Sequence, residues 1–285
     1  MNTVLELISF AKFKLSSRYD TRETKAIVLS IFVDYFKFSP NDIYLKENEI
    51  QTSKLCDDFF VIINRLINGE PLNYVLGFKY CMNLCLKLNR DTLIPRPETE
   101  ELILFANDKI KDKKALLDIG TGSGFIAIAL AKLNPLLEVT ASDISSNALK
   151  MAKENAILNN VRVDFKLSDI LDTKNELEGL FDIIISNPPY IKECEKAQMS
   201  AEVIDFEPSR ALFVPNDNAL IFYRRIAEYA LEHLNDEGQL FFEINENLAE
   251  ETLSLIASLG FSDSELVHDI NNKPRIIHSL YYKKS

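Results

Sequence analysis

Histidine and cysteine are scarce in this chain of 285 residues, and tryptophan is absent. Of the four cysteines, Cys81 and Cys85 lie close together, but no second pair completes the spacing of a metal site. The three histidines are scattered and add no such spacing. We therefore expect no bound metal, and we expect reduced, partly buried cysteine side chains as in proteins of the cytoplasm.

Basic residues are outnumbered, since 32 Lys and Arg residues stand against 43 Asp and Glu residues and give a net charge of -11. Binding to nucleic acid needs a basic excess that displaces counterions from the phosphate backbone. The net charge therefore argues against direct binding to nucleic acid, although it does not reveal whether the fold gathers basic residues into a patch on one face. A basic protein partner fits the charge better.

Long apolar runs are also missing. No stretch is long enough to span a membrane, and Lys12 and Lys14 interrupt the apolar N-terminal segment, which a signal peptide would need intact. We expect a cytoplasmic protein with no membrane partner. Its 47% of hydrophobic residues suffice for one large domain and one small domain, each with its own core.

The first part of the chain, residues 1–77, is predicted to be a small all-α domain. Apolar residues recur at helical spacing in three segments between residues 4 and 67. Pro40 is expected to end the second helix, and Gly69 to cap the third. Since no residue here suggests catalysis, we expect a role in stability or in docking a partner.

The pattern then changes to a period of two. Apolar residues at every second position from Phe78 to Leu88 predict a β-hairpin, with these side chains on one face, in a linker over residues 78–93. The prolines in the following segment, Ile94–Glu100, favour an extended backbone, after which Glu98 or Thr99 is expected to open a helix.

Strands and helices alternate in residues 94–285, which predicts an α/β domain whose mostly parallel, Rossmann-like sheet is covered by helices on both faces. The predicted strands lie near residues 115–118, 139–142, 163–167, 183–185, 239–244, 265–267 and 276–281. The predicted helices lie near residues 125–133, 148–158, 221–234 and 249–259.

Three alternating glycines, Gly120, Gly122 and Gly124, lie between a predicted strand and a predicted helix. Glycines there let a ligand approach the backbone and present N–H groups at the positive end of the helix. A tight turn alone would explain one or two of them. A dinucleotide fingerprint would need the third glycine one residue later, where the chain has Phe125, so a nicotinamide or flavin cofactor is disfavoured.

Two aspartates follow the next two predicted strands. Asp143 comes about twenty residues after the glycines, where a carboxylate can bind both hydroxyls of a ribose. Asp169 could accept a hydrogen bond from an adenine amino group. Either aspartate alone is more often a helix cap or a solvated charge. Together with the glycines, at the ends of three strands of one sheet, they predict a site for S-adenosylmethionine, an adenosine with an amino-acid tail.

The segment Asn187-Pro188-Pro189-Tyr190 follows the predicted strand at residues 183–185. The two prolines stiffen this loop, and its carbonyl oxygens stay free as acceptors. The Asn187 amide and the flat ring of Tyr190 add to them. These groups suit a planar substrate group that carries an NH2, so the motif alone leaves adenine, cytosine and a glutamine amide open.

These motifs resemble those of known enzymes. The segment Asp118–Gly124 with Asp143 resembles class I methyltransferases, which use S-adenosylmethionine, and the Asn187–Tyr190 segment resembles those that methylate amino groups. Over nearly the whole chain the sequence is similar to the HemK-type family, which methylates the glutamine of the Gly-Gly-Gln motif in peptide chain release factors. The segments that carry this likeness are Glu70–Gly77, Ile94–Glu100 and Phe206–Leu212.

The resemblance implies a fold, partners and site residues. It implies a class I methyltransferase sheet with an antiparallel last strand, and residues 1–77 that dock a class I release factor. The implied cofactor contacts, for S-adenosylmethionine and its product S-adenosylhomocysteine, are Gly120, Thr121, Gly122, Ser123, Gly124, Asp143, Asp169, Ile170 and Asn187. Asn187, Pro188 and Tyr190 are implied as catalytic residues. The implied substrate contacts are Asn187, Pro188, Pro189, Tyr190, Arg96 and Glu98.

Three places depart from the family pattern. Pro215–Ala219 stands where glycines are usual, Asn245 replaces a glycine, and Ile170 stands where many members have an aromatic residue. They bear on cofactor affinity and on loops beside the site. Two alternatives stay open: an adenine-N6 methyltransferase for tRNA or DNA, against which the acidic balance argues, and a non-catalytic scaffold.

Overall fold

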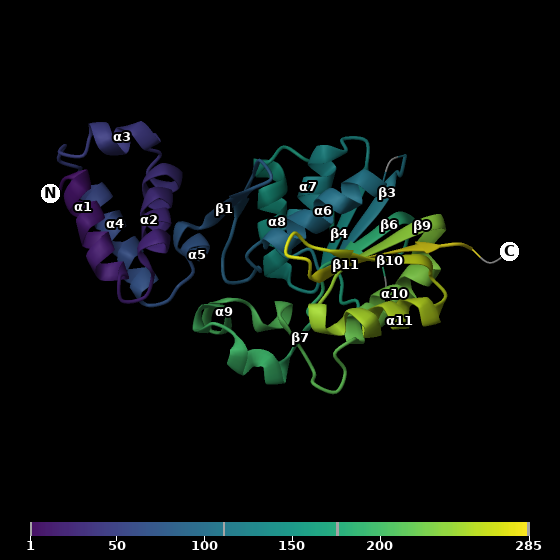
Figure 1. Ribbon diagram of the computed structural model, residues 1–285. Helices are drawn as coiled ribbons and strands as arrows, with labels where there is room; N and C mark the ends of the chain where they lie inside the picture. The colour runs from purple at the N-terminus through teal and green to yellow at the C-terminus, as the bar shows by residue number, and fades with distance from the viewer. Residues whose placement is uncertain (1, 111, 175–176, 284–285) are drawn as a thin grey trace. The chain divides into compact units, whose positions relative to one another are not determined.

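The computed structural model describes residues 2–110, 112–174 and 177–283. The chain forms two compact units (Figure 1). One unit comprises Met1–Gly77 with Ser200–Phe206, and the other comprises Phe78–Met199 with Glu207–Ser285. The second unit contains the large sheet that the alternation of strands and helices predicted.

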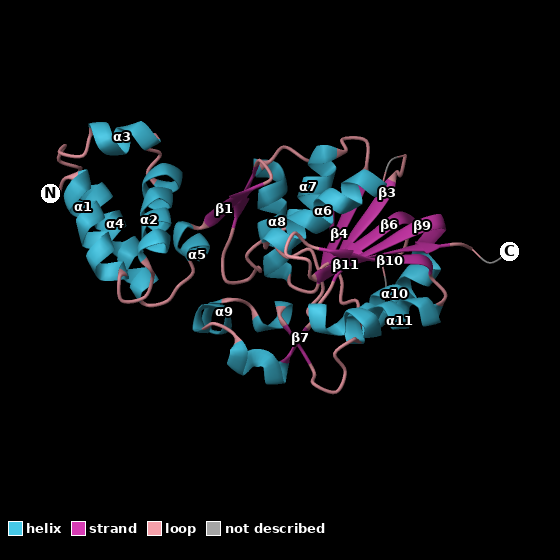
Figure 2. Ribbon diagram, in the orientation of Figure 1, coloured by secondary structure: helices cyan, strands magenta, loops and turns pink. Residues whose placement is uncertain are grey.

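The first unit is built of helices around an apolar core (Figure 2). Its helices are α1 (Val4–Leu15), α2 (Thr21–Ser30), the π-helical turn η1 (Ile31–Tyr35), α3 (Pro40–Leu45), α4 (Ser53–Ile67), α5 (Leu72–Leu76) and α9 (Ala201–Phe206). The side chains that α1 and α4 bury include Leu7, Leu15 and Phe59. Helix α9 is held by Glu202, which accepts hydrogen bonds from Arg18 Nε at 3.0 Å and from the Tyr19 hydroxyl at 3.3 Å.

Pro40 does not have the predicted role. The helical segment that begins with α2 already ends at Tyr35, and Pro40 is instead the first residue of α3. Proline fits a first helical position because its missing N–H would have no partner there, and Ser39 with Asp42 forms a capping box. The prediction that Pro40 ends the second helix was therefore wrong.

The predicted β-hairpin is present, but its apolar side chains do not share one face. Strands β1 (Phe78–Cys81) and β2 (Leu84–Lys87) are joined by two residues, 82 and 83, with φ of 48° and 60°. A two-residue turn pairs even-numbered positions of one strand with odd-numbered positions of the other. Leu86 is therefore buried while Tyr80 is 51% exposed, and the prediction of one shared face was wrong.

The second unit contains a seven-stranded sheet in the order β10-β11-β9-β6-β3-β4-β5. Its strands are β3 (Ala115–Ile119), β4 (Glu138–Asp143), β5 (Asp164–Leu167), β6 (Phe181–Ser186), β9 (Leu234–Glu243), β10 (Ser262–His268) and β11 (Pro274–Tyr281). From β9 to β5 neighbours are parallel, while β11 is antiparallel to both β9 and β10. The expected mostly parallel sheet with an antiparallel last strand is confirmed.

Helices cover both faces of this sheet (Figure 2). One apolar core contains α6 (Pro97–Lys109) and α7 (Phe125–Leu133), with Val161 and Val163 after α8 (Ser146–Leu158) packed against it. The opposite core contains residues of α10 (Ile221–His233) and α11 (Ala249–Leu259). Alternate residues of each strand supply the two cores, because side chains of a strand point to opposite faces.

The strand order creates a switch point between β3 and β6. From β3 the chain moves outward to β4 and β5, and it then returns to place β6 on the other side of β3. Ligands of open α/β sheets bind at such a point, outside the carboxyl ends of the strands. Within the described residues no helix is long and apolar enough to cross a membrane, and no group of His, Cys, Asp or Glu side chains could hold a metal ion.

Candidate active site at the carboxyl end of the sheet

The predicted site residues meet at the switch point. Ile119, the last residue of β3, lies opposite Ser142 of β4 and Ser186 of β6. The glycine loop, Asp143 and Asn187 directly follow these three residues in the chain. The glycine loop, the first predicted aspartate and the start of the Asn187–Tyr190 loop therefore lie at one edge of the sheet.

The glycine loop has an open face. Gly120, Gly122 and Gly124 all adopt positive φ, at 77°, 55° and 86°. A Cβ atom added at Gly120 or Gly122 would meet no described atom within 4 Å. One added at Gly124 would lie 2.8 Å from Ile128 Cδ1 and 3.1 Å from Ala152 Cβ, so this glycine lets α7 pack close to α8. The first two glycines leave room for a ligand beside the backbone.

Asp118 lies fully buried beside this loop, and half of its carboxylate is unpaired. Its Oδ2 accepts hydrogen bonds from Thr121 Oγ1 at 2.6 Å and from the Ala127 N–H at 3.2 Å. Its Oδ1 has no hydrogen-bond partner among the described residues. Burial raises the pKa of this carboxyl to about 7. An orphaned buried carboxylate oxygen fits a cationic group such as the ammonium of an amino acid.

Asp118 belongs to the sequence motif Asp118–Gly124, but no role was predicted for this residue. The signal was present in its place two residues before Gly120, at the end of a buried strand. What the sequence could not reveal is that Thr121 and Ala127 occupy one carboxylate oxygen and leave the other free.

Asp143 ties the glycine loop to β4. Its Oδ2 accepts from the Gly122 N–H and its Oδ1 from the Ser145 N–H, each at 2.8 Å. Burial raises the pKa of its carboxyl, opposed by these two hydrogen bonds. Each carboxylate oxygen has a second lone pair, so Asp143 could still accept from a ribose hydroxyl.

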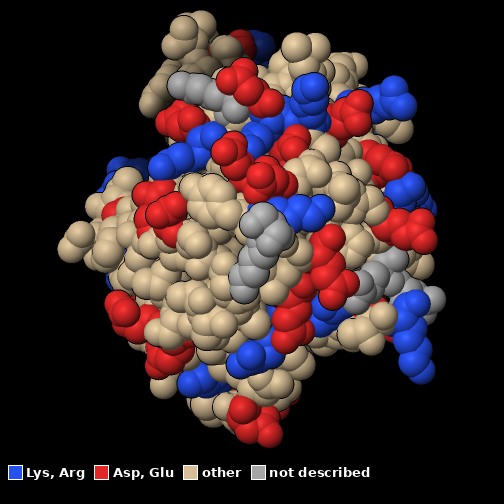
Figure 3. Space-filling model, turned by 90° about the vertical axis from the view of Figure 1, so that its right-hand side faces the viewer, with Lys and Arg blue, Asp and Glu red and all other residues tan. Residues whose placement is uncertain are grey.

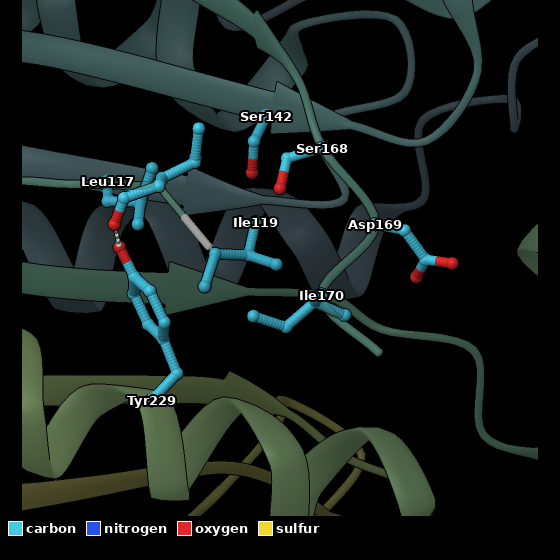
Figure 4. Close-up of a pocket in the computed structure, with 8 residues that line it drawn as sticks. Leu117, Ile119, Ser142, Ser168, Asp169, Ile170 and Tyr229 are labelled. Carbon is cyan, nitrogen blue, oxygen red and sulfur yellow. Dashed lines mark hydrogen bonds between the residues drawn. The ribbon is translucent and has the colours of Figure 1, made fainter. Parts of the chain in front are cut away.

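Asp169 and Ile170 follow β5 and line a small cavity (Figure 4). The other residues that line it are Leu117, Ile119, Ser142, Ser168, Leu177 and Tyr229. The Asp169 carboxylate points away from Tyr229 (Figure 4), and its Oδ1 accepts from the Leu171 N–H at 2.9 Å. The cavity lies beside the carboxyl ends of β3 and β4, where an adenine ring could reach both predicted residues.

The Asn187–Tyr190 loop is tied to one buried carboxylate, that of Glu243 at the end of β9. Asn187 Nδ2 donates to Thr99 Oγ1 at 3.1 Å, and this hydroxyl donates to Glu243 Oε2 at 2.7 Å. The Tyr190 hydroxyl donates to Glu243 Oε1 at 3.3 Å. Both polar side chains of the loop thus converge, directly or through Thr99, on one carboxylate.

The surroundings of Glu243 favour its protonated form. Burial raises the pKa of its carboxyl to about 7, and nearby Glu98 adds to the rise while Arg275 and the hydrogen bonds oppose it. Burial and the Glu243 charge raise the pKa of the Tyr190 phenol well above its usual range. Asn245, one of the departures from the family pattern, donates to the Tyr190 carbonyl oxygen at 3.2 Å and so supports the same loop.

Thr99 lies inside helix α6 and not at its start. Helix α6 begins at Pro97, with Arg96 at its N-cap, so neither Glu98 nor Thr99 opens it as predicted. Proline at a first helical position needs no N–H partner. The Thr99 side chain is thereby left to join Asn187 to Glu243.

The two predicted substrate residues of this segment lie in different surroundings. Arg96 Nη2 lies 2.5 Å from Glu207 Oε1, and Glu207 Oε2 accepts from the Ile94 N–H at 3.4 Å. This ion pair ties the segment before α6 to residue 207. Glu98 lies near Tyr190 and Arg275, whose pKa values its charge helps to raise. The substrate roles of both residues stay predictions.

Comparisons with known proteins agree with this architecture. The methyltransferase small domain family matches residues 100–212. A release factor glutamine methyltransferase of Flavobacterium psychrophilum is 40% identical over 268 residues, 92% of this chain and 94% of that protein. One of Bacteroides thetaiotaomicron is 37% identical over 271 residues, 95% and 98% of the two chains. The chain belongs to the release factor glutamine methyltransferase family. The expected HemK-type resemblance is confirmed.

Solved structures share the fold at much lower identity. A methyltransferase from Pyrococcus furiosus has a TM-score of 0.55 at 18% identity, with 81% of this chain and 100% of that chain covered. The catalytic domain of hMettl16, in complex with the MAT2A 3'UTR hairpin 6, has a TM-score of 0.56 at 14% identity, with 82% and 84% covered. At these identities the likeness establishes the methyltransferase fold and nothing finer.

Proposed function

We propose that this protein transfers a methyl group from S-adenosylmethionine to the side-chain amide nitrogen of the glutamine in the Gly-Gly-Gln motif of class I peptide chain release factors. The observation that carries the proposal is the placement of Asn187 beside the open glycine loop, in a chain of this family. A planar NH2 group held at Asn187 would lie next to a donor held at the glycines.

The residues at the strand ends fit S-adenosylmethionine. The open faces of Gly120 and Gly122 admit a ligand to the backbone, and the orphaned Asp118 Oδ1 suits its ammonium group. We assign contacts with the cofactor to the other residues of the glycine loop as well, namely Thr121, Ser123 and Gly124. Asp143 is assigned to its ribose. The residues assigned to the surroundings of its adenine and its methyl group are Asp169, Ile170 and Asn187. When bound, the cofactor supplies an electrophilic methyl group, and S-adenosylhomocysteine remains.

The Asn187–Tyr190 loop would prepare the amide nitrogen. Its lone pair is delocalised into the carbonyl, so the nitrogen is a poor nucleophile until its protons are drawn to acceptors. Asn187 Oδ1 and the Pro188 carbonyl oxygen are such acceptors, while Pro189 stiffens the loop and the Tyr190 ring packs on the amide plane. No strong base is required, because the proton can leave to water after transfer.

The remaining parts of the chain have proposed roles as well. We assign residues 1–77 to docking of the release factor, residues 78–93 to a linker, and residues 94–285 to methyl transfer, with Arg96 and Glu98 near the substrate. Because a release factor acts at cytoplasmic ribosomes, we propose the same compartment for the enzyme. On the face drawn in Figure 3, acidic and basic side chains intermix, which with the net charge of -11 suits a protein substrate better than a nucleic acid.

A labelling experiment tests the substrate class. The protein is incubated with S-adenosylmethionine labelled in the methyl group and, separately, with full-length release factor, tRNA and DNA. We expect label on the release factor and none after its motif glutamine is replaced by alanine. Label on tRNA or DNA instead would overturn the proposal in favour of adenine-N6 methylation.

A further inference from the structure

We propose that Glu243 is a positioning residue that, through the Thr99 hydroxyl, fixes the direction in which the Asn187 side-chain amide points. The three side chains come from the end of β9, the first turn of α6 and the loop after β6. The inference deepens the proposed function and rests on it, since it concerns the acceptor oxygen that Asn187 offers to the substrate amide.

The first step is the bond between Thr99 and Glu243. The Glu243 side chain is 1% exposed, and an ionised carboxylate can only accept hydrogen bonds. When Glu243 is ionised, above its pKa of about 7, the Thr99 hydroxyl therefore donates its single proton to Glu243 Oε2, at 2.7 Å. Charge-assisted bonds of this kind are stronger than bonds between neutral groups, so the direction of the hydroxyl is well fixed.

The second step is the bond between Asn187 and Thr99, which fixes the orientation of the Asn187 amide. Because Thr99 Oγ1 has no proton left, it presents lone pairs to Asn187, and the Asn187 Nδ2 donates to it at 3.1 Å. The nitrogen and oxygen of an asparagine amide have nearly the same shape, so the neighbouring partner decides which one points where. With Nδ2 held at Thr99, the Oδ1 atom is left as an acceptor for an N–H of the substrate.

The hydrogen bonds from Asn187 through Thr99 to Glu243 form a relay, and the charge of Glu243 controls its direction. A protonated Glu243 could donate to Thr99, which could then donate to Asn187, and the amide would turn its NH2 toward the substrate NH2. The titratable groups that face Glu243 are Glu98 of α6, Tyr190 of the loop, Arg275 of β11 and Tyr223 of α10. Since burial raises the pKa of Glu243 to about 7, we expect transfer to weaken as the pH falls below that value.

Substitutions of Thr99 distinguish a role of its hydroxyl group in methyl transfer from a role of its side-chain shape in packing. Thr99→Val keeps the β-branched shape and removes the hydroxyl, whereas Thr99→Ser keeps the hydroxyl. We expect Thr99→Val to lower kcat for release-factor methylation by roughly 10- to 100-fold with an unchanged KM for S-adenosylmethionine. Thr99→Ser should keep a kcat roughly ten times that of Thr99→Val. A Thr99→Val enzyme that binds cofactor and methylates at the wild-type rate would overturn the relay.

The pH profile provides a second readout that packing would not change. Wild-type kcat should rise with pH through about 7, whereas Glu243→Gln should lose this step. A glutamine there can still accept from Thr99 through its oxygen, while its NH2 donates to the Tyr190 hydroxyl oxygen. The same step in both enzymes would contradict the inference.

A measurement without substrate keeps the inference distinct from the proposed function. In the full-length protein labelled with ¹⁵N, the side-chain NH2 of Asn187 should show one hydrogen-bonded proton. This signal should be lost in Thr99→Val, and it should change near pH 7 in the wild type but not in Glu243→Gln. Identical spectra would overturn the relay even if the release factor is methylated. A failure to methylate the release factor, with these spectral changes present, would contradict the proposed function alone.

Discussion

The Thr99 hydroxyl lies 2.7 Å from the Glu243 carboxylate, although 144 residues separate the two in the chain. One residue lies in the first turn of α6 and the other ends β9, so the bond links a helix to the carboxyl edge of the sheet. Asn187 and Tyr190 both hydrogen-bond to this pair. The loop that we propose to bind the substrate amide is thus held in place by hydrogen bonds to a buried pair of side chains.

Asn187→Ala should separate transfer from cofactor binding. The change removes the proposed acceptor for the substrate amide, and we expect kcat to fall by about 100-fold or more. Titration calorimetry should still show S-adenosylmethionine binding, weakened far less than transfer because the other proposed cofactor contacts remain. Ser258→Ala, at an exposed serine near the end of α11 with no proposed role, is the control for transfer. An Asn187→Ala enzyme with normal kcat would rule out the proposed role.

Gly120→Ala and Gly124→Ala should differ in stability although both glycines have positive φ. Backbone strain alone should cost Gly120→Ala about 1 kcal/mol, since its added methyl meets open space. The methyl of Gly124→Ala would also press on Ile128 and Ala152, which brings the expected loss to about 2–4 kcal/mol. Urea unfolding measures both. Gly120→Ala should in addition weaken cofactor binding, and equal stabilities of the two variants would contradict the packing role of Gly124.

Asp118→Asn should change how stability depends on pH. The folded-state pKa of Asp118 is raised to about 7, so between about pH 4 and 7 the folded state binds a proton that the unfolded state lacks. Wild-type stability therefore has a contribution that falls as the pH rises through this window. The stability of Asp118→Asn relative to the wild type should rise by up to about 1.4 kcal/mol per pH unit there, and it should level off above pH 7.

Urea unfolding of the wild type and of Asp118→Asn, without cofactor and from pH 4 to pH 8, measures the difference between their free energies of unfolding. The same substitution should weaken S-adenosylmethionine binding, because the ammonium group would lose its proposed carboxylate partner. A difference in stability that stays constant with pH would show that the Asp118 carboxyl titrates in its ordinary range.

Arg96→Ala should report whether Arg96 is structural or binds substrate. The change leaves the Glu207 carboxylate buried without its cation, and we expect a loss of about 3 kcal/mol in the free energy of unfolding. Glu207→Gln in the same chain should restore most of it. If the double variant also recovers the wild-type KM for the release factor, the arginine is structural. A KM that stays raised supports the proposed substrate contact.

Local patterns predicted much of the second unit. The apolar run 125–133 after the glycines is α7 as predicted, and the seven expected strands are all present. These elements were readable because burial on both faces leaves long apolar runs, with glycines and aspartates marking where they end. The Gly120 loop and Asn187 meet as predicted because parallel strands end at one edge.

Features that depend on how strands pair, or on contacts between residues far apart in the chain, were not predicted from the sequence. The alternation from Phe78 to Leu88 was misassigned because a two-residue turn changes the parity of the pairing. No local pattern joins Thr99 to Glu243, and none marks that Ser200–Phe206 packs in the helical unit. Such contacts depend on the path of the chain in three dimensions, which residue spacing along a sequence does not contain.

The most direct test locates the methyl group on the substrate. Full-length release factor is incubated with S-adenosylmethionine and either the wild-type protein or Asn187→Ala, and tandem mass spectrometry then reads the peptide that contains the Gly-Gly-Gln motif. We predict one added methyl group on the side chain of that glutamine with the wild type and almost none with Asn187→Ala. An unmodified glutamine after incubation with wild-type protein that binds the cofactor would contradict the proposed function.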